Sequence, residues 1–235
     1  MPSFKAVLLD WVGTLIVPKW GASRGYPAGG PWIERSLRQV GRAASAAEVA
    51  RISAALSEAG NCADVTAGWA GADLAAAAHL AGYLRWVTTA GVDPVLADAM
   101  YATLSDVADN QFAVDVEPTL AALKASGVKV AIVSDIHVDI RPCFVKTGLD
   151  VYVDEFVLSF EVGACKPDPA IFHTALTRLG VLPDEALMVG DRSGHDGAAV
   201  EAGVMTLLIP PLTHVDERRL DRVLATCGLP PGRTP

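Results

Sequence analysis

Short apolar runs alternate with longer amphipathic segments over most of the chain. The runs are rich in Val, Ile and Leu, and three of them lead directly into Asp, Ser or Gly, a pattern typical of strands buried in a parallel sheet. Strands are predicted at residues 4–9, 128–133, 155–159, 186–189 and 204–209.

Segments with a helical period separate these strands, and most of them end at a glycine. Strands joined by helices in this order indicate an α/β fold, a doubly wound parallel sheet with right-handed connections. Helices are predicted at residues 118–126, 141–147, 169–179, 194–202 and 216–226.

The interval after the first strand has a different composition. Residues 18–31 are rich in Gly, Pro and aromatic residues, which predicts a loop, and Ala-rich helical segments follow it. Because no strand pattern interrupts these helices, we expect an inserted helical bundle over residues 17–112 and a sheet domain built from 1–16 and 113–235. The predicted helices of the insertion are 32–40, 46–59, 73–89 and 94–110.

Charge and composition narrow the class of protein. The 235 residues carry a formal net charge of −8, which argues against an extended nucleic-acid surface. No apolar run approaches the roughly 20 residues of a membrane span, and the N-terminus has no leader pattern, so we expect a cytoplasmic protein. The cysteines form no paired spacing and are expected to be reduced: Cys62, Cys143, Cys165 and Cys227.

Four polar clusters follow four of the predicted strands. They are residues 10–14 (Asp-Trp-Val-Gly-Thr), 134–137 (Ser-Asp-Ile-His), 166–169 (Lys-Pro-Asp-Pro) and 190–196 (Gly-Asp-Arg-Ser-Gly-His-Asp). Each cluster alone is a common turn or helix entry, but parallel strands bring their carboxyl ends to one edge of the sheet, where ligands bind. We therefore expect the four clusters to form one site.

Asp10 is the most informative residue of this set. A carboxylate at the end of a buried strand is a covalent nucleophile, a metal ligand, or both. If the carboxylate attacks a phosphoryl group, both partners are anionic. The site then needs a divalent cation and an ammonium group to reduce the repulsion between them. Asp10 and Asp191 supply the oxygen ligands that Mg²⁺ prefers, and Lys166 supplies the ammonium.

The order and spacing of the four clusters resemble those of the haloacid dehalogenase superfamily over nearly the whole chain. The resemblance implies a Rossmann-like core with a mobile helical cap. It also implies a small, phosphorylated substrate, and we expect the protein to be a monomer or a homodimer. It implies that Asp10 is the nucleophile, with Ser134 and Lys166 contacting the transferred phosphoryl group. The implied Mg²⁺ ligands are Asp10, the Val12 carbonyl and Asp191; Asp196 would order Lys166 or a metal-bound water.

Further candidates for binding the substrate lie in the site clusters and the predicted cap hinge. Thr14 and Asp135 belong to the first two clusters. Arg24 could pair with an anionic group, and Trp20 could supply an apolar wall. Trp32 is more simply explained as a packing residue.

Val12 is a departure from the phosphatases of this superfamily, which carry a second Asp two residues after the nucleophile as general acid and base. General acid–base catalysis typically raises the reaction rate by about 10²–10⁴-fold.

Three hypotheses follow from the absence of this Asp. In the first, the protein is a Mg²⁺-dependent phosphohydrolase whose substrate has a good leaving group, or in which His137 or His195 replaces the acid.

The second hypothesis is chemistry at carbon, as in 2-haloacid dehalogenases and a phosphonate-cleaving relative whose first motif is similar. The phosphonate enzyme needs a cap lysine, whereas Lys19 is the only lysine between Asp10 and Lys124 and lies at the hinge. Dehalogenases usually lack the Gly190-Asp191 pair. The third hypothesis is a weakened descendant that binds a ligand without hydrolysing it.

Overall fold

The computed structural model describes residues 4–17, 22–23, 26–27, 30–107 and 110–232. The chain divides into two compact units. Unit 1 comprises Met1–Pro18 and Ala108–Pro235, and unit 2 comprises Lys19–Val107. Unit 1 begins its second segment before residue 113, the predicted boundary, because Phe112 pairs with Ile16 and packs on Trp11.

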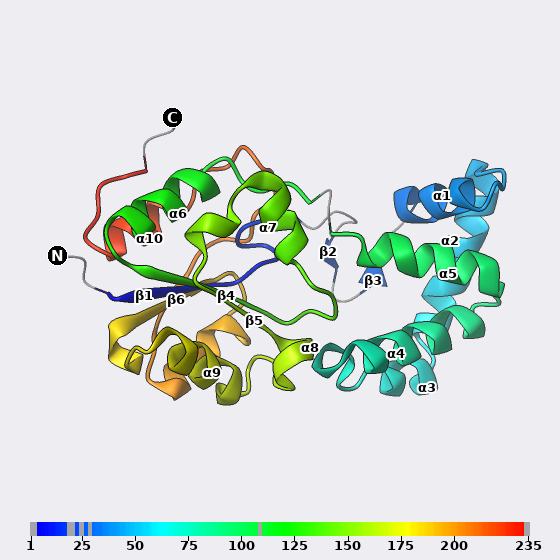
Figure 1. Ribbon diagram of the computed structural model, residues 1–235. Helices are drawn as coiled ribbons and strands as arrows, with labels where there is room; N and C mark the ends of the chain where they lie inside the picture. The colour runs from blue at the N-terminus through cyan, green and yellow to red at the C-terminus, as the bar shows by residue number, and fades with distance from the viewer. Residues whose placement is uncertain (1–3, 18–21, 24–25, 28–29, 108–109, 233–235) are drawn as a thin grey trace. The chain divides into compact units, whose positions relative to one another are not determined.

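Unit 1 is built on a five-stranded parallel sheet with the order β5-β4-β1-β6-β7 (Figure 1). The register places Leu9 of β1 beside Ile132 of β4 and Val189 of β6. The polar residues that follow these strands therefore lie at one edge. The strands are β1 (Ala6–Leu9), β4 (Lys129–Ser134), β5 (Glu155–Leu158), β6 (Ala186–Gly190) and β7 (Met205–Leu208).

Helices cover both faces of this sheet, as the α/β prediction requires (Figure 1). One face carries α6 (Val116–Ala125), α7 (Arg141–Thr147) and α10 (Asp221–Thr226), and the other carries α9 (Pro169–Leu179) and the 3₁₀ helix η4 (Asp196–Ala202). The remaining short helices of unit 1 are η2 (Asp150–Tyr152), α8 (Ser159–Val162) and η3 (Pro183–Glu185).

The strands are apolar at both odd and even positions because both faces are covered. Ala6 and Leu8 belong to the core cluster that packs against α9, whereas Val7 and Leu9 point to the opposite face and are equally inaccessible to solvent. β1 is the central strand of the sheet and is buried on both faces, and Asp10 directly follows it.

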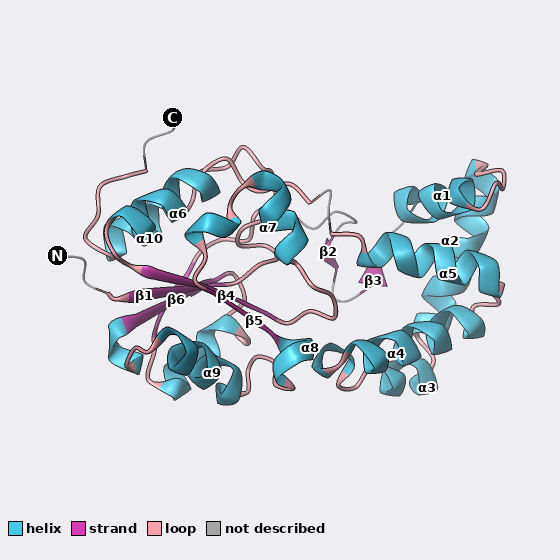
Figure 2. Ribbon diagram, viewed as in Figure 1, coloured by secondary structure: helices cyan, strands magenta, loops and turns pink. Residues whose placement is uncertain are grey.

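Unit 2 is mainly helical and has its own core (Figure 2). Trp32 and Trp86 stack with ring centroids 6.0 Å apart, and their indole N–H groups donate to backbone carbonyls. Trp32 is thus a packing residue, as expected. The helices are α1 (Gly30–Gln39), α2 (Ala46–Gly60), α3 (Ala63–Gly68), η1 (Ala72–Leu74), α4 (Ala76–Thr89) and α5 (Pro94–Ser105).

Several local predictions were wrong. A two-stranded antiparallel pair, β2 (Ala22–Ser23) and β3 (Tyr26–Pro27), lies in the segment predicted as loop. The helix predicted at 73–89 breaks at Ala75, whose backbone is extended, and α3 was missed because it is only six residues long. The last helix begins at Asp221 rather than 216, because the preceding segment makes contacts with other parts of unit 1.

His79 of α4 gives unit 2 a predicted pH dependence. Burial lowers the pKa of His79 to about 4, and its Nδ1 lies 3.4 Å from the Tyr101 hydroxyl. The unfolded chain takes up this proton near pH 6.5 and the folded chain only near pH 4, so stability falls as the pH drops through that window. The slope is at most about 1.4 kcal/mol per pH unit.

We expect His79→Gln to lose this part of the slope. The free energy of urea unfolding, measured across the window for wild type and variant, reports the difference directly. His173→Gln, on the exposed face of α9, controls for loss of a histidine. Parallel curves for wild type and His79→Gln would contradict the assignment.

Candidate active site

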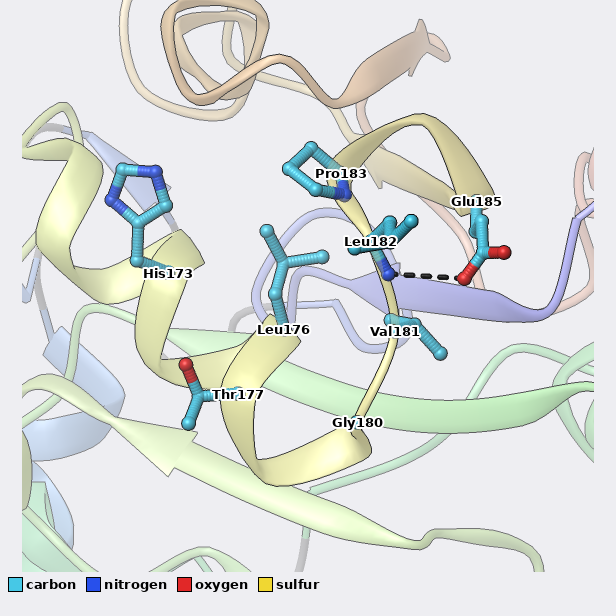
Figure 3. A pocket seen from close by; sticks show the side chains of 8 residues that line it. All are labelled: His173, Leu176, Thr177, Gly180, Val181, Leu182, Pro183 and Glu185. Carbon is cyan, nitrogen blue, oxygen red and sulfur yellow. Dashed lines mark hydrogen bonds between the residues drawn. The ribbon is translucent and has the colours of Figure 1, made fainter.

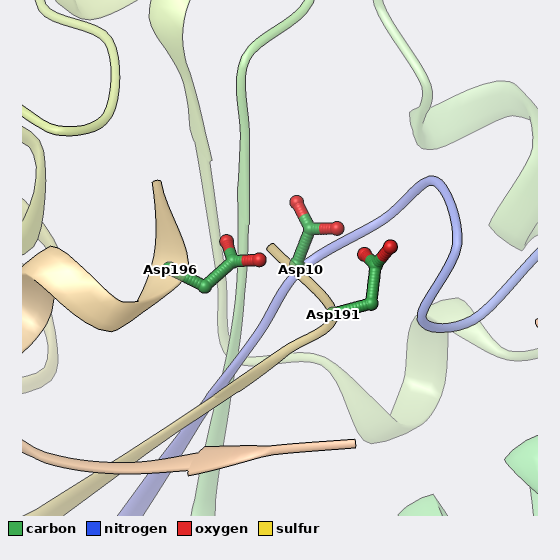
Figure 4. Close-up of side chains that lie close together, drawn as sticks. All are labelled: Asp10, Asp191 and Asp196. Atoms are coloured by element: carbon green, nitrogen blue, oxygen red, sulfur yellow. The ribbon is translucent and has the colours of Figure 1, made fainter. Parts of the chain in front are cut away.

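Three carboxylates meet at the carboxyl edge of the sheet. Asp10 follows β1, Asp191 follows β6, and Asp196 begins η4; one ligand oxygen of each lies within 4.8 Å of the others (Figure 4). Asp10 and Asp196 are buried and Asp191 is half-buried. The structure thus brings together the first and fourth predicted clusters, and the strand register is the reason.

Lys166 joins two of these carboxylates. Its Nζ donates to Asp10 Oδ1 at 2.5 Å and to Asp196 Oδ1 at 2.6 Å, and it lies 3.3 Å from the carbonyl oxygen of Val133. The side chain is 2% exposed, so water cannot compete for the ammonium group. An uncompensated buried charge would be costly, and the two carboxylates offset that cost.

Burial and neighbouring charges shift the pKa of both partners. Burial raises the pKa of Asp10 to about 6; Lys166 opposes this rise, whereas Asp196 and Asp191 add to it. Burial acts against the charged form of Lys166, but the carboxylates of Asp10 and Asp196 raise its pKa above the ordinary value. The site therefore holds a permanent ammonium group and an excess of negative charge.

Gly13 and Thr14 shape the turn between Asp10 and Asp191. Gly13 has a φ of +84°, and a Cβ at this position would lie 2.7 Å from Asp191 Oδ2, so a larger residue would displace that carboxylate. The Thr14 hydroxyl lies 3.4 Å from Asp10 Oδ2 and 3.5 Å from Asp191 Oδ1. The Thr14 hydroxyl thus lies beside both candidate metal ligands, and its role in substrate binding stays a prediction.

The second predicted cluster supports the site from one side. Ser134 ends β4 and is buried, and the backbone of Ile136 is held by the Ser159 hydroxyl. Asp135 accepts from the backbone N–H of Lys166 at 2.8 Å, and its other oxygen lies 3.3 Å from His195 Nδ1. Asp135 thereby fixes the loop that carries Lys166.

His195 is held on both ring nitrogens. Nδ1 faces Asp135, and Nε2 lies 2.6 Å from an Arg192 guanidinium nitrogen. An arginine can only donate, so Nε2 accepts and Nδ1 carries the proton. Nε2 is thus occupied, and this arrangement does not favour His195 as a proton donor to a leaving group. The sequence did not indicate the pairing with Arg192.

Other predicted residues are placed less directly. Trp20 and Arg24 lie outside the described residues. His137 lies in the loop after β4. Its acid–base role stays a prediction. Val12 is 37% exposed, with its backbone bridged to Ile16.

Comparisons with known proteins agree with this geometry. The family model for haloacid dehalogenase-like hydrolases matches residues 4–203. The chain belongs to this family. A glyceraldehyde 3-phosphate phosphatase from Methanopyrus kandleri is 41% identical over 97 residues, which are 40% of this chain and 42% of that protein. The chain thus spans less than half the length of that curated relative.

Solved structures share the fold. A haloacid dehalogenase superfamily phosphatase from Thermococcus onnurineus matches with a TM-score of 0.59 and 21% identity, covering 97% of this chain and 99% of that one. A 2-haloacid dehalogenase from Pseudomonas syringae matches with a TM-score of 0.57 and 23% identity, covering 87% and 86%. At these identities the matches establish the fold alone.

The family implies a divalent metal ion, and the residues present fit one. Three carboxylates lie together with one ammonium group between two of them. Burial raises the pKa of Asp10, and the charges of Asp196 and Asp191 add to that rise. Both Asp196 oxygens accept hydrogen bonds from the protein, at Lys166 and at the Arg192 N–H. Asp10 and Asp191 would therefore be better placed than Asp196 to hold a divalent cation, while Asp196 accepts a hydrogen bond from Lys166.

A groove elsewhere in unit 1 is separate from this site. It is lined by the end of α9 and by η3, including His173, Pro183 and Glu185 (Figure 3). Glu185 precedes β6 and Asp191 follows it, so the groove and the carboxylates lie at opposite ends of one strand.

No described helix is long and apolar enough to cross a membrane.

Asp191→Asn should weaken Mg²⁺ binding while retaining the fold, because the amide keeps an acceptor for Thr14 but loses the charge. We expect a loss larger than the roughly 10-fold that removal of an outer-shell partner costs. Isothermal titration with Mg²⁺ measures it. Asp184→Asn, exposed near the other end of β6, is the matched control, and equal affinities in the two variants would refute the assignment.

Proposed function

We propose that the protein is a Mg²⁺-dependent phosphohydrolase that acts on a small phosphorylated metabolite through an aspartyl-phosphate on Asp10. The observation that carries this proposal is the buried contact of Lys166 with Asp10 and Asp196, beside Asp191. An anionic nucleophile next to a permanent ammonium group and a pair of metal-ligating carboxylates suits transfer of an anionic phosphoryl group. The phosphatase name of the Methanopyrus kandleri relative supports the same reaction class.

Two displacements at phosphorus make up the reaction. A carboxylate oxygen of Asp10 attacks phosphorus, and the bond to the leaving oxygen breaks with its electron pair staying on that oxygen. Water then attacks the acyl phosphate, which releases inorganic phosphate and restores the Asp10 carboxylate. Lys166 and the Ser134 hydroxyl would contact the phosphoryl oxygens, and bound Mg²⁺ would neutralise their charge.

Protonation of the leaving oxygen is the step that Val12 cannot assist. His195 is held on both nitrogens, which leaves His137 as the remaining histidine candidate in these loops. A substrate whose leaving group departs without a proton needs neither residue for the first displacement; in the second displacement the attacking water gives its proton to solvent or to the phosphate oxygens. The proposal therefore favours an activated phosphate, such as an acyl phosphate, over a simple alkyl ester.

Two alternatives remain distinct hypotheses. In a dehalogenase, the Asp191 carboxylate near Asp10 would repel the departing halide, which argues against that reaction. A ligand-binding protein without turnover would retain affinity for phosphorylated compounds and release no phosphate. A screen of acyl phosphates, phosphate esters and 2-haloacids, with and without Mg²⁺, separates the three hypotheses.

Asp10→Asn should abolish phosphate release, because the amide is a poor nucleophile. We expect a loss of more than about 10³-fold in kcat, and the same loss in wild type after chelation of Mg²⁺. Acid-quenched wild-type enzyme should yield a phosphorylated peptide containing Asp10. Asp184→Asn is the control; metal-independent turnover, or halide release in place of phosphate release, would overturn the proposal.

Val12→Asp should raise turnover of poor-leaving-group esters by about 10²-fold and change turnover of activated phosphates little. The physical reason is that only a poor leaving group needs the new acid. Single-turnover measurements isolate phosphoryl transfer from hydrolysis of the intermediate, and Val12→Asn controls for polarity. Loss of an existing activity in Val12→Asp with Mg²⁺ still bound would instead indicate that an apolar side chain is required.

A further inference from the structure

Arg219 is a buried arginine that no motif of the sequence singled out. It lies in the segment before α10 and is 5% exposed. One guanidinium nitrogen donates to the carbonyl oxygen of Gly13 at 3.2 Å and also to that of Pro210; the other donates to the carbonyl of Thr14 at 2.5 Å. A single side chain therefore binds the turn after Asp10 and the segment after β7.

The same segment reinforces this link through its backbone. The N–H of Leu212 donates to Gly13 at 2.7 Å, and the N–H of Ile209 donates to Gly190, the residue before Asp191, at 3.0 Å. The turn that carries Thr14 and the strand that delivers Asp191 are thus held by one stretch of chain, to which the Arg219 side chain adds its hydrogen bonds with the Gly13 and Thr14 carbonyls.

Asp115 fixes Arg219 from the opposite side. This carboxylate is fully buried and accepts from the backbone N–H groups of Arg219 and of Leu220, the latter at 2.7 Å. Burial lowers the pKa of Arg219, and the charges of Asp115 and of Asp191 oppose that change. A guanidinium group stays protonated throughout the ordinary pH range, so the contacts with Gly13 and Thr14 are charge-assisted.

The position of Thr14 connects these contacts to the carboxylates. Its carbonyl binds Arg219, while its hydroxyl lies within 3.5 Å of both Asp10 and Asp191. Gly13 passes so close to Asp191 that a Cβ on it would collide with that carboxylate. A shift of the turn would therefore change the separation of the two candidate metal ligands.

We propose that Arg219 is a positioning residue that holds the Gly13–Thr14 turn so that the carboxylates of Asp10 and Asp191 stay ready to bind a divalent cation. The expected effect of Arg219 on turnover rests on the proposed function. Its expected effect on cation binding does not depend on any catalytic activity. Arg219 itself contacts backbone carbonyls and neither the metal ligands nor the reacting atoms.

Arg219→Met tests the proposal with three readouts. We expect Mg²⁺ affinity, measured by titration calorimetry, to fall by about 10-fold, the lower end of the usual outer-shell effect. Hydrogen exchange of the amides in residues 11–16 should become faster, and kcat should fall more than KM changes. Added guanidinium ion should restore part of the Mg²⁺ affinity.

Leu224→Ala is the matched control, because Leu224 is fully buried in α10 and its apolar side chain makes no hydrogen bond to the Gly13–Thr14 turn. It should lower the unfolding temperature without changing Mg²⁺ affinity or exchange at residues 11–16. An equal loss of affinity in both variants would show that general destabilisation is the cause, and the proposal would be wrong.

Arg219→Lys keeps the positive charge near Asp115. It is the second test variant, for use if Arg219→Met does not fold. One ammonium group cannot reproduce the fork that reaches the Gly13 and Thr14 carbonyls, so we expect weaker Mg²⁺ binding here too. Wild-type affinity and exchange in Arg219→Lys would overturn the proposal. Tight Mg²⁺ binding by wild type without phosphate release would overturn the proposed function alone.

Discussion

The candidate site depends on one buried ammonium group shared by two carboxylates. Lys166 is 2% exposed and reaches Asp10 and Asp196 at 2.5 and 2.6 Å. Neither the cation nor the anions could be buried alone at acceptable cost, so each fixes the position of the others. The contact with Lys166 therefore ties the end of β1, where Asp10 lies, to the start of η4, where Asp196 lies.

The neighbouring loops hold this arrangement in place. Asp135 holds the backbone of Lys166, and Thr14 lies between Asp10 and Asp191. Residues of this kind keep charged groups of like sign close together, which costs stability in the free protein. A bound divalent cation would relieve this repulsion, so the same crowding of carboxylates favours cation binding.

Val12 stands where the phosphatases that the first motif resembles carry an acid–base Asp, so under the proposed function it separates binding of a phosphoryl group from protonation of the leaving group. The groups that neutralise charge are present, whereas the carboxylate that would supply a proton is absent. This combination fits a hydrolase whose substrate carries its own good leaving group. It also explains why membership of the haloacid dehalogenase-like hydrolases, which the family match establishes, does not by itself give the substrate.

The sequence alone determined the parallel sheet, the core strands and the carboxylate edge, because strand periodicity is local and parallel strands align their ends. β6 and α9 lie close to their predicted limits, and Asp10, Lys166 and Asp191 meet as expected. Only the tertiary structure decided which groups pair. Lys166 and Asp10 are 156 residues apart, and Arg219 reaches Thr14 across 205. Such contacts leave no periodic signal, since they depend on packing between distant segments.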